Sequence, residues 1–330
     1  MTPIAPHITA FLQERLPQQQ AASEHTCDSY AYAFQLLFKF AAARLRVTPS
    51  ALCVEQLDAS LLMDFLQHLE TERGNSARTR NARLVAIKSF MRFMEHRVPA
   101  ILEQSRRILA IPVKRTDTRL INYLSLGEMQ ALLNTPDITC RDGIRDRAML
   151  HLCFSAGLRV SELVNLPLHA LEWQPSPNVR VHGKGRRERL LPIWKQTATD
   201  LRAWLAVRGH PPVTELFVNA RDQTMTRSGF EYVLDKHVQV AAESCPSLKQ
   251  KRISPHVLRH AAAMLILQAT GDIRKVSLWL GHADIQTTEV YLRADPTEKL
   301  EAISALVPPT LKRGRFRAPD KLIASLRSAK

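Results

Sequence analysis

A short stretch in the last third of the chain carries three side chains that can hold or move charge. In SPHVLRHAAAMLILQ, residues 254–268, His256, Arg259 and His260 lie within five positions and an apolar run follows. Residues three and four apart lie on one face of a helix. The spacing therefore predicts a helix start from which two imidazoles and a guanidinium project together. Such a face suits a metal ion, a phosphate, or ordinary local hydrogen bonds.

The metal interpretation is the weakest of these. His256 and His260 have the i, i+4 spacing of zinc ligands, and His282 supplies a third imidazole. No glutamate lies between them as in the His-Glu-x-x-His motif, and Arg259 on the same face would repel a cation. The chain also lacks a glycine-rich phosphate loop. We therefore expect neither a metal nor another cofactor.

Three more motifs carry residues suited to chemistry on a phosphate. SAGLRVSELVNL contains Arg159 and Glu162, VHGKGRRERLLPI contains Lys184, and LGHADIQTTEVYLR contains His282 and Tyr291. Each motif alone is a weak or moderate signal. Their joint occurrence in this order is a strong one, because together they offer charge stabilisation, proton transfer and a nucleophile.

In these residues the sequence resembles the tyrosine recombinases, the phage-integrase and Xer-type family. The resemblance covers the whole chain in outline and residues 120–293 in detail. It implies a helical N-terminal core-binding domain and a mixed catalytic domain that clamp a DNA duplex between them. The catalytic positions of the family match Arg159, Lys184, His256, Arg259, His282 and Tyr291, with Glu162 and His260 as supporting residues.

The implied reaction breaks a phosphodiester bond while conserving its energy in a covalent enzyme–DNA link. Tyr291 would attack to form a 3′-phosphotyrosyl bond, and its ordinary pKa of about 10 means that it needs assistance. Arg159 and Arg259 would hold the charge that develops on the phosphate, because planar guanidinium forks match its oxygens. Lys184 would protonate the leaving 5′ oxygen. The other implied roles are proton movement or phosphate binding for His256 and His282, and orientation of Arg159 or His256 by Glu162.

The elements that must position these residues form a helical first third and a mixed remainder. Apolar residues recur at helical spacing in DSYAYAFQLLFKFAAARL, DASLLMDFLQHLETER and NSARTRNARLVAIKSFMRFMEHR. Two short strands are expected at 179–182 and 188–192 around a Gly-Lys-Gly turn. The predicted fold is mainly α with a small antiparallel β component. The predicted parts are a helical core-binding (DNA-clamping) domain at 1–111, a linker at 112–119, a mixed α+β catalytic domain at 120–307, and a basic C-terminal tail at 308–330.

The charge of the chain favours a nucleic-acid partner. Lys plus Arg number 46 against 31 for Asp plus Glu, giving a formal charge of +15. A chain this basic typically binds a polyanion. The expected partner is double-stranded DNA at paired recombination sites, held by a homo- or heterotetrameric synapse of recombinase protomers. DNA contacts are predicted for Arg78, Arg80, Arg83, Lys88, Arg92, Lys114, Arg115, Arg186 and Arg187.

The cysteines and the N-terminus indicate the compartment. The five cysteines are scattered and form no Cys-x-x-Cys pair, which favours a reducing environment. The sequence shows neither a signal-peptide pattern nor an apolar run long enough for a bilayer. We therefore expect a cytoplasmic protein with no membrane partner.

The predicted function is site-specific recombination, with integration or transposition of a mobile element as the biological role. The extended basic tail is similar to that of recombinases encoded by mobile elements. Two alternatives keep the chemistry: a type IB topoisomerase that nicks and reseals DNA, and a chromosome or plasmid dimer resolvase. Two others change it: a non-catalytic DNA-binding regulator and a metal-dependent nuclease.

Overall fold

The structure is a computed structural model of the 330-residue chain, and it describes residues 1–116, 122–183, 188–282 and 284–294. The chain divides into two compact units, Met1–Thr118 and Arg119–Lys330. Residues 117–119 of the predicted linker, the basic tail, and Lys184, Arg186 and Arg187 lie outside the described residues. Of the helices that are described, none combines the length and apolar character needed to cross a bilayer.

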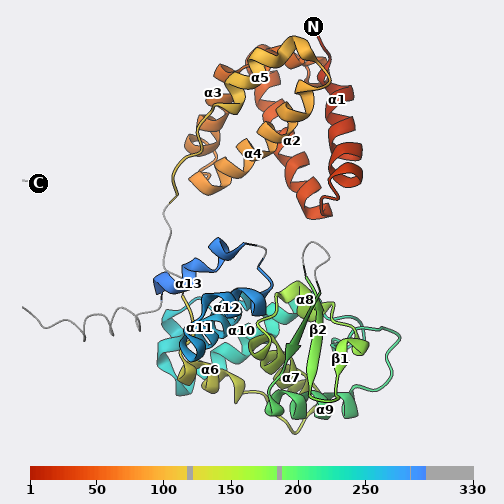
Figure 1. Ribbon diagram of the computed structural model, residues 1–330, viewed down its shortest axis with the longest axis vertical. Coiled ribbons are helices and arrows are strands. Elements are labelled where there is room, and N and C mark those ends of the chain that lie inside the picture. The colour runs from red at the N-terminus through yellow and green to blue at the C-terminus, as the bar shows by residue number, and fades with distance from the viewer. Residues whose placement is uncertain (117–121, 184–187, 283, 295–330) are drawn as a thin grey trace, which may run out of the picture. The chain divides into compact units, whose positions relative to one another are not determined.

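The first unit is built from helices packed around an aromatic core (Figure 1). Its three long helices begin after a Ser or Asp whose side chain accepts a backbone N–H of the first turn, which satisfies a donor that the helix leaves free. Phe11, Phe34 and Phe90 are each at most 2% exposed and meet edge to face. The elements are α1 (Ile4–Ala10), a π-helical segment η1 (Phe11–Gln19), α2 (Glu24–Leu45), α3 (Ala59–Thr71), α4 (Ala77–Glu95) and α5 (Leu102–Leu109), with 3-10 turns η2 (Pro49–Ala51), η3 (Val54–Gln56) and η4 (Pro99–Ile101).

One basic position of α4 is not on its surface. Arg80 is only 3% exposed, and its Nη1 donates to the carbonyl oxygen of Pro112 at 3.1 Å. Its place is explained by the helical period, since Arg80 precedes the buried Leu84 by four residues and therefore lies on the apolar stripe. The expectation that Arg80 contacts DNA is thus corrected: its guanidinium holds the chain that follows α5 against α4.

The other basic positions of this unit divide between structural contacts and the surface. Lys88 is half-buried and its Nζ donates to the carbonyl oxygen of Ile111 at 2.6 Å. Burial lowers the pKa of Lys88, and the nearby arginines lower it further. Arg83 is half-buried, with its guanidinium carbon 4.9 Å from the centroid of the Tyr32 ring. The exposed basic positions among those predicted are Arg78, Arg92, Lys114 and Arg115.

The second unit combines helices with a three-stranded antiparallel sheet of order β1-β2-β3. Val179 pairs with Leu191 and Val181 with Arg189, and the two valines are at most 1% exposed, so alternate residues point into the core. The two predicted strands are confirmed, whereas β1 was not predicted. The elements are α6 (Leu126–Leu133), α7 (Arg141–Ser155), α8 (Val160–Val164), η5 (Leu168–Ala170), β1 (Leu171–Glu172), β2 (Asn178–His182), β3 (Glu188–Pro192), α9 (Lys195–Arg208), α10 (Arg227–Ser244), η6 (Pro246–Gln250), α11 (Pro255–Thr270), α12 (Ile273–Leu280), η7 (Ile285–Thr287) and α13 (Glu289–Ala294).

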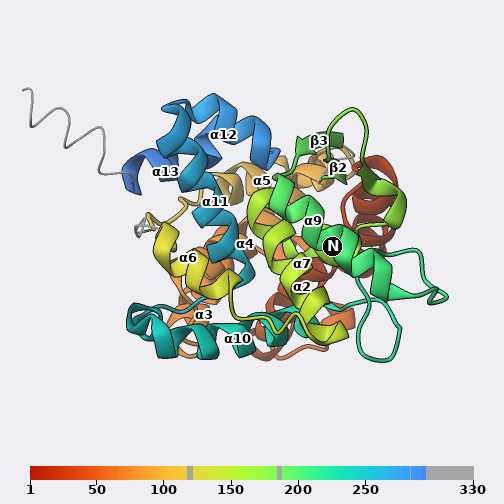
Figure 2. The same ribbon diagram turned by 90° about the horizontal axis from the view of Figure 1, so that it is seen from below.

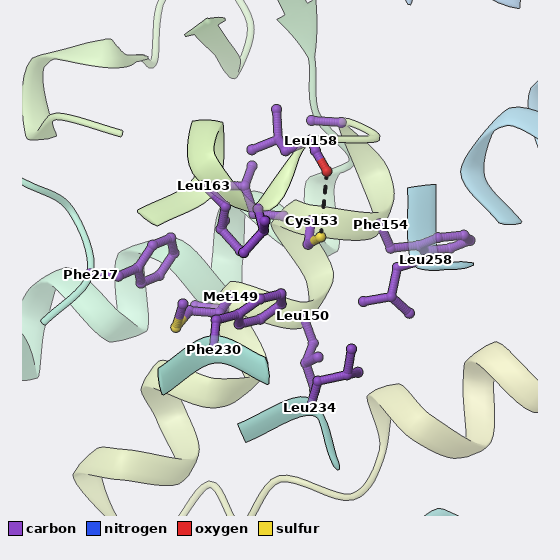
Figure 3. Close-up of a cluster of buried hydrophobic side chains, with 14 of the residues drawn as sticks. Met149, Leu150, Cys153, Phe154, Leu158, Leu163, Phe217, Phe230, Leu234 and Leu258 are labelled. Atoms are coloured by element: carbon purple, nitrogen blue, oxygen red, sulfur yellow. Dashed lines mark hydrogen bonds between the residues drawn. The ribbon is translucent and has the colours of Figure 1, made fainter. Parts of the chain in front are cut away.

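Helix α7 forms the centre of this unit. Figure 3 shows its side chains Met149, Leu150, Cys153 and Phe154 among apolar residues from α10, α11 and the segment that precedes α10. The helix ends before Gly157, whose φ of +58° is one that L side chains rarely adopt. The chain then turns directly into α8, so the rigid end of α7 fixes the position of Arg159.

Helix α11 packs against α7, and α12 and α13 each pack against α11 (Figure 2). Pro255 is the first residue of α11, where a missing N–H costs no helical hydrogen bond. The helix start predicted for the His256 stretch is therefore confirmed. The mainly helical fold with a small antiparallel sheet, divided into a helical part and a mixed part, is also confirmed.

Candidate active site

Arg259 is the most buried charged residue among the predicted catalytic residues, at 4% exposed. Its Nη1 donates to the carbonyl oxygen of Gly157 and its Nη2 to that of Leu280, each at 2.6 Å. One guanidinium therefore joins the end of α7 to the end of α12. Burial, followed by the charge of Arg159, lowers the pKa of Arg259 to about 10, so it remains charged at neutral pH.

Glu162 lies among three arginines. Arg159 Nη1 donates to one of its carboxylate oxygens at 2.7 Å, and the Arg159 backbone N–H donates to the other at 2.9 Å. Arg189 meets both oxygens with Nη1 and Nη2, at 3.1 and 2.7 Å. Arg259 Nη1 lies 3.9 Å away. Glu162 thus bonds Arg159, one of the two partners that the sequence suggested for it.

The surroundings keep this carboxylate ionised. Burial alone would raise the pKa of Glu162, but the hydrogen bonds and charge of Arg189, with those of Arg159, hold it below its ordinary value. One negative charge therefore faces three positive ones, and the cluster carries a net positive charge. Such a cluster attracts an anion, and Arg159, whose side chain is 29% exposed, is its most accessible member.

Tyr291 is buried, at 2% exposed, within a small apolar cluster of α11 and α12 residues that includes Met264 and Leu280. Its hydroxyl lies 2.9 Å from Nδ1 of His260. Burial raises the pKa of Tyr291, while the positive charges of Arg259 and Arg159 oppose that rise. The predicted nucleophile therefore lies within the electrostatic reach of both predicted phosphate ligands.

The three histidines have different environments. Burial lowers the pKa of His260 to about 4, and the neighbouring His256 and Arg259 add to the effect. Burial also lowers the pKa of His282 to about 4, and the charge of Arg259 is the next largest cause. Nδ1 of His282 lies 2.7 Å from Oγ1 of the buried Thr288. His256 is exposed, and its pKa is lowered by partial desolvation and then by Arg259. All three are therefore neutral at pH 7, and a neutral ring can accept a proton.

The arrangement brings together five of the six predicted catalytic residues around the ends of α7, α11, α12 and α13. The sixth, Lys184, lies outside the described residues. His260 was predicted as a supporting residue, and the structure places it directly on the Tyr291 hydroxyl. Sequence reasoning missed Arg189 and Thr288. The alternation of inward-facing and outward-facing side chains along β3 is the signal that would have identified Arg189.

These low pKa values predict that the second unit loses stability in mild acid. His260 and His282 have folded pKa values of about 4, below the 6.5 of a free histidine. Between those values the unfolded chain binds more protons, so stability is full above pH 6.5 and falls as the pH drops toward 4. We expect a lower urea midpoint at pH 5 than at pH 7.

Tryptophan fluorescence confines the measurement to the second unit, because all four tryptophans, at positions 173, 194, 204 and 279, belong to it. The carboxylate of Glu128, with a pKa lowered to about 2, contributes only below pH 4.5 and does not interfere. His260→Gln should show a shallower dependence on pH than the wild type. An equal or higher midpoint at pH 5 would contradict the burial of neutral histidines.

The described residues contain no cluster of three or more His, Cys, Asp or Glu side chains arranged to hold a metal ion. Of the three histidines considered as ligands, His260 directs Nδ1 to Tyr291 and His282 directs Nδ1 to Thr288. One ring nitrogen of each of these two histidines is thus engaged with a hydroxyl group of the site.

Comparison with known proteins identifies the family. Residues 122–298 match the phage integrase family, and residues 8–98 match the phage integrase N-terminal SAM-like domain. The chain is 42% identical over 325 residues to "Putative integrase/recombinase y4rC" of Sinorhizobium fredii, covering 98% of each chain. It is 31% identical over 309 residues to the tyrosine recombinase XerC of Pelobacter propionicus, covering 93% of this chain and 97% of that one.

A solved structure shows the same fold. The XerH site-specific recombinase bound to palindromic difH substrate superposes with a TM-score of 0.68 at 20% identity, over 89% of this chain and 83% of that one. The chain belongs to the phage integrase family, the tyrosine recombinases, whose members are site-specific recombinases. The resemblance seen in the catalytic motifs and the enzyme class that it implied are confirmed.

Proposed function

We propose that this protein cleaves and rejoins DNA at specific sites through a 3′-phosphotyrosyl intermediate on Tyr291. The observation that supports this most is the placement of a tyrosine hydroxyl 2.9 Å from a neutral histidine, beside a buried arginine cluster with a net positive charge. The histidine can take the proton, and the arginines can hold the phosphate. A metal ion is not needed to neutralise the phosphate in this scheme.

The cleavage step replaces one phosphate ester bond by another. The Tyr291 oxygen attacks the phosphorus while its proton passes to Nδ1 of His260, provided that this neutral ring carries its own proton on Nε2. The bond between phosphorus and the 5′ oxygen breaks, and Lys184 gives the leaving oxygen a proton. Arg159 and Arg259 stabilise the charge that develops on the non-bridging oxygens. His282, held by Thr288, and His256 complete the phosphate site.

Strand exchange reverses this step with a different strand. A 5′-hydroxyl from the partner duplex attacks the phosphotyrosyl bond, releases Tyr291, and restores the DNA backbone without an external energy source. Because Tyr291 is buried, its hydroxyl must become accessible before it can reach DNA, and we propose that DNA binding drives this change. The protein would act on DNA in the cytoplasm, as one protomer of a tetrameric synapse.

We further propose that the recombinase serves integration or transposition of a mobile element. This rests on the integrase/recombinase name of the Sinorhizobium relative, which matches 98% of the chain, and on the basic tail. Inverted repeats that flank the gene, and are cut by the protein, would support the mobile-element role. Cleavage confined to a chromosomal dimer-resolution site would favour the resolvase, and relaxation of plasmids without any special site would favour a type IB topoisomerase.

The experiment that tests the proposed function uses a nicked suicide substrate containing the recombination site. The short 5′ strand diffuses away after cleavage, so the covalent intermediate accumulates. The wild-type protein should give a DNA–protein adduct that survives SDS and forms in excess EDTA. Absence of any adduct would favour a DNA-binding regulator, and cleavage that EDTA abolishes would favour a metal-dependent nuclease.

The first unit is proposed to grip the DNA backbone through the exposed arginines of α4. Arg78 and Arg92 are both exposed, whereas Arg80 is buried. Each phosphate contact adds about −0.9 to the slope of log affinity against log salt. The double variant Arg78→Ala, Arg92→Ala should therefore bind with a slope about 1.8 shallower than that of the wild type.

A matched double variant on another helix tests whether position matters. Arg106 and Arg107 of α5 are also exposed, but lie outside the predicted DNA-facing set. Arg106→Ala, Arg107→Ala removes the same charge and should leave the salt slope unchanged. Equal changes in both double variants would show that only net charge matters, and no change in either would remove α4 from the DNA interface.

A further inference from the structure

Arg189 is the one member of the arginine cluster to which the proposed reaction gives no role. It lies on β3, paired with Val181 and two residues before the buried Leu191, so its side chain projects from the inner face of the sheet. Its neighbour Leu190 is 50% exposed on the outer face. A charged side chain that points inward from a strand requires a partner, and here that partner is Glu162.

The contact between the two has the geometry of a bidentate fork. Arg189 Nη1 and Nη2 meet separate oxygens of Glu162 at 3.1 and 2.7 Å, and the Arg189 side chain is 10% exposed. Charge-assisted forks of this kind are the strong members of their class. Arg189 thus binds the carboxylate through both of its terminal nitrogens, whereas Arg159 donates a single side-chain N–H to it.

The backbone beside His282 makes room for this side chain. Gly281 has φ +64°, and a Cβ there would lie 3.1 Å from Nη1 and 3.2 Å from Cδ of Arg189. A larger residue at 281 would strain the backbone and crowd the guanidinium. Arg189 therefore fills a space bounded by the sheet, by Glu162 and by the turn that carries His282.

We infer that Arg189 is a positioning residue that occupies both oxygens of Glu162, so that Arg159 and Arg259 keep their charge and their free N–H groups for the DNA phosphate. Without Arg189, the buried carboxylate would face only Arg159 at 2.7 Å and Arg259 at 3.9 Å. Its negative charge would then draw both away from the phosphate and cancel part of their field. This inference rests on the proposed DNA cleavage.

A double-mutant cycle tests the inference, with the rate of adduct formation on the suicide substrate as the readout. Arg189→Ala should slow cleavage roughly 10-fold to 100-fold, the loss typical of residues that orient reacting groups. In a Glu162→Gln background, Arg189→Ala should reduce the rate of adduct formation much less, because Arg189 acts through that carboxylate. Arg189→Lys should recover only part of the rate, since lysine keeps the charge but not the fork.

The salt dependence of binding distinguishes positioning from direct contact. Arg189→Ala should leave the slope of log affinity against log salt unchanged, whereas Arg159→Ala should make it about 0.9 shallower. Arg180→Ala is the matched control, because Arg180 also pairs with a glutamate of the sheet, donating from Nε and Nη2 to one oxygen of Glu172 at a more exposed position. This variant should cleave at the wild-type rate.

Two results would overturn the inference. Equal losses for Arg189→Ala with and without Glu162→Gln would show that Arg189 does not act through the carboxylate, and a shallower salt slope would make it a phosphate ligand. If Arg189→Ala fails to fold by tryptophan fluorescence, the cycle is run with Arg189→Lys and is read in the same way. A wild-type protein that forms no adduct at all would overturn the proposed function and this inference together.

Discussion

Tyr291→Phe is expected to abolish the covalent adduct on a nicked suicide substrate while leaving DNA affinity unchanged. The substitution removes only the hydroxyl, so the ring still fills its apolar site beside Met264 and Leu280. The lost hydrogen bond to His260 costs about 0.5–1.5 kcal/mol of folding stability, which is too little to unfold a domain. The yield of adduct should fall to zero, because no phosphotyrosyl bond can form without the tyrosine oxygen.

A neighbouring tyrosine provides the control. Tyr123 is half-buried against the same apolar cluster, and Tyr123→Phe removes a hydroxyl of the same kind from the same unit. It should give the wild-type yield of adduct. An adduct of undiminished yield in Tyr291→Phe, or an equal loss in both variants, would refute the assignment of Tyr291.

Arg159→Ala is expected to slow adduct formation by roughly a hundredfold to a thousandfold, the usual loss for one preorganised donor to a developing oxyanion. Arg159 gives the cleaner test of the two phosphate ligands. Among the described residues, the Arg159 guanidinium hydrogen-bonds only to Glu162, and that carboxylate keeps both contacts with Arg189 when Arg159 is truncated. Folding, followed by the four tryptophans, should therefore change little.

Arg259→Ala provides the contrast. Arg259 bonds the carbonyl oxygens of Gly157 and Leu280 inside the protein, so its removal leaves two buried acceptors unpaired. Arg259→Ala should lose activity at least as strongly as Arg159→Ala. It should also lose about 1–3 kcal/mol of folding stability for each carbonyl oxygen that is left without a partner. Wild-type cleavage by Arg159→Ala in a folded protein would remove this residue from the phosphate site.

The regular parts of the fold could be predicted because their periods were clear. The alternation of Val179 and Val181 indicated a strand, which the structure contains as part of β2. Strand β1 could not be predicted, since two residues have no period. Arg80 was wrongly predicted to contact DNA because the prediction rested on its charge and not on its position four residues before Leu84. The carbonyl oxygen of Pro112 accepts a hydrogen bond from its guanidinium, which makes the burial of this charge tolerable.

The candidate site could be predicted as a set of residues but not as a geometry. The order of motifs indicated which side chains meet, yet His260 and Tyr291 are 31 residues apart, and their contact depends on how α13 packs against α11. The same holds for Arg189, which reaches Glu162 across 27 residues. Contacts of this kind arise from tertiary packing, which local patterns do not encode.

The most direct test of the account is to locate the DNA on the protein. The adduct formed by the wild type in excess EDTA would be digested with nuclease and trypsin, and the modified peptide would be sequenced by mass spectrometry. We expect a nucleotide attached through its 3′-phosphate to Tyr291. A nucleotide on any other residue, or a 5′-phosphate linkage, would contradict it.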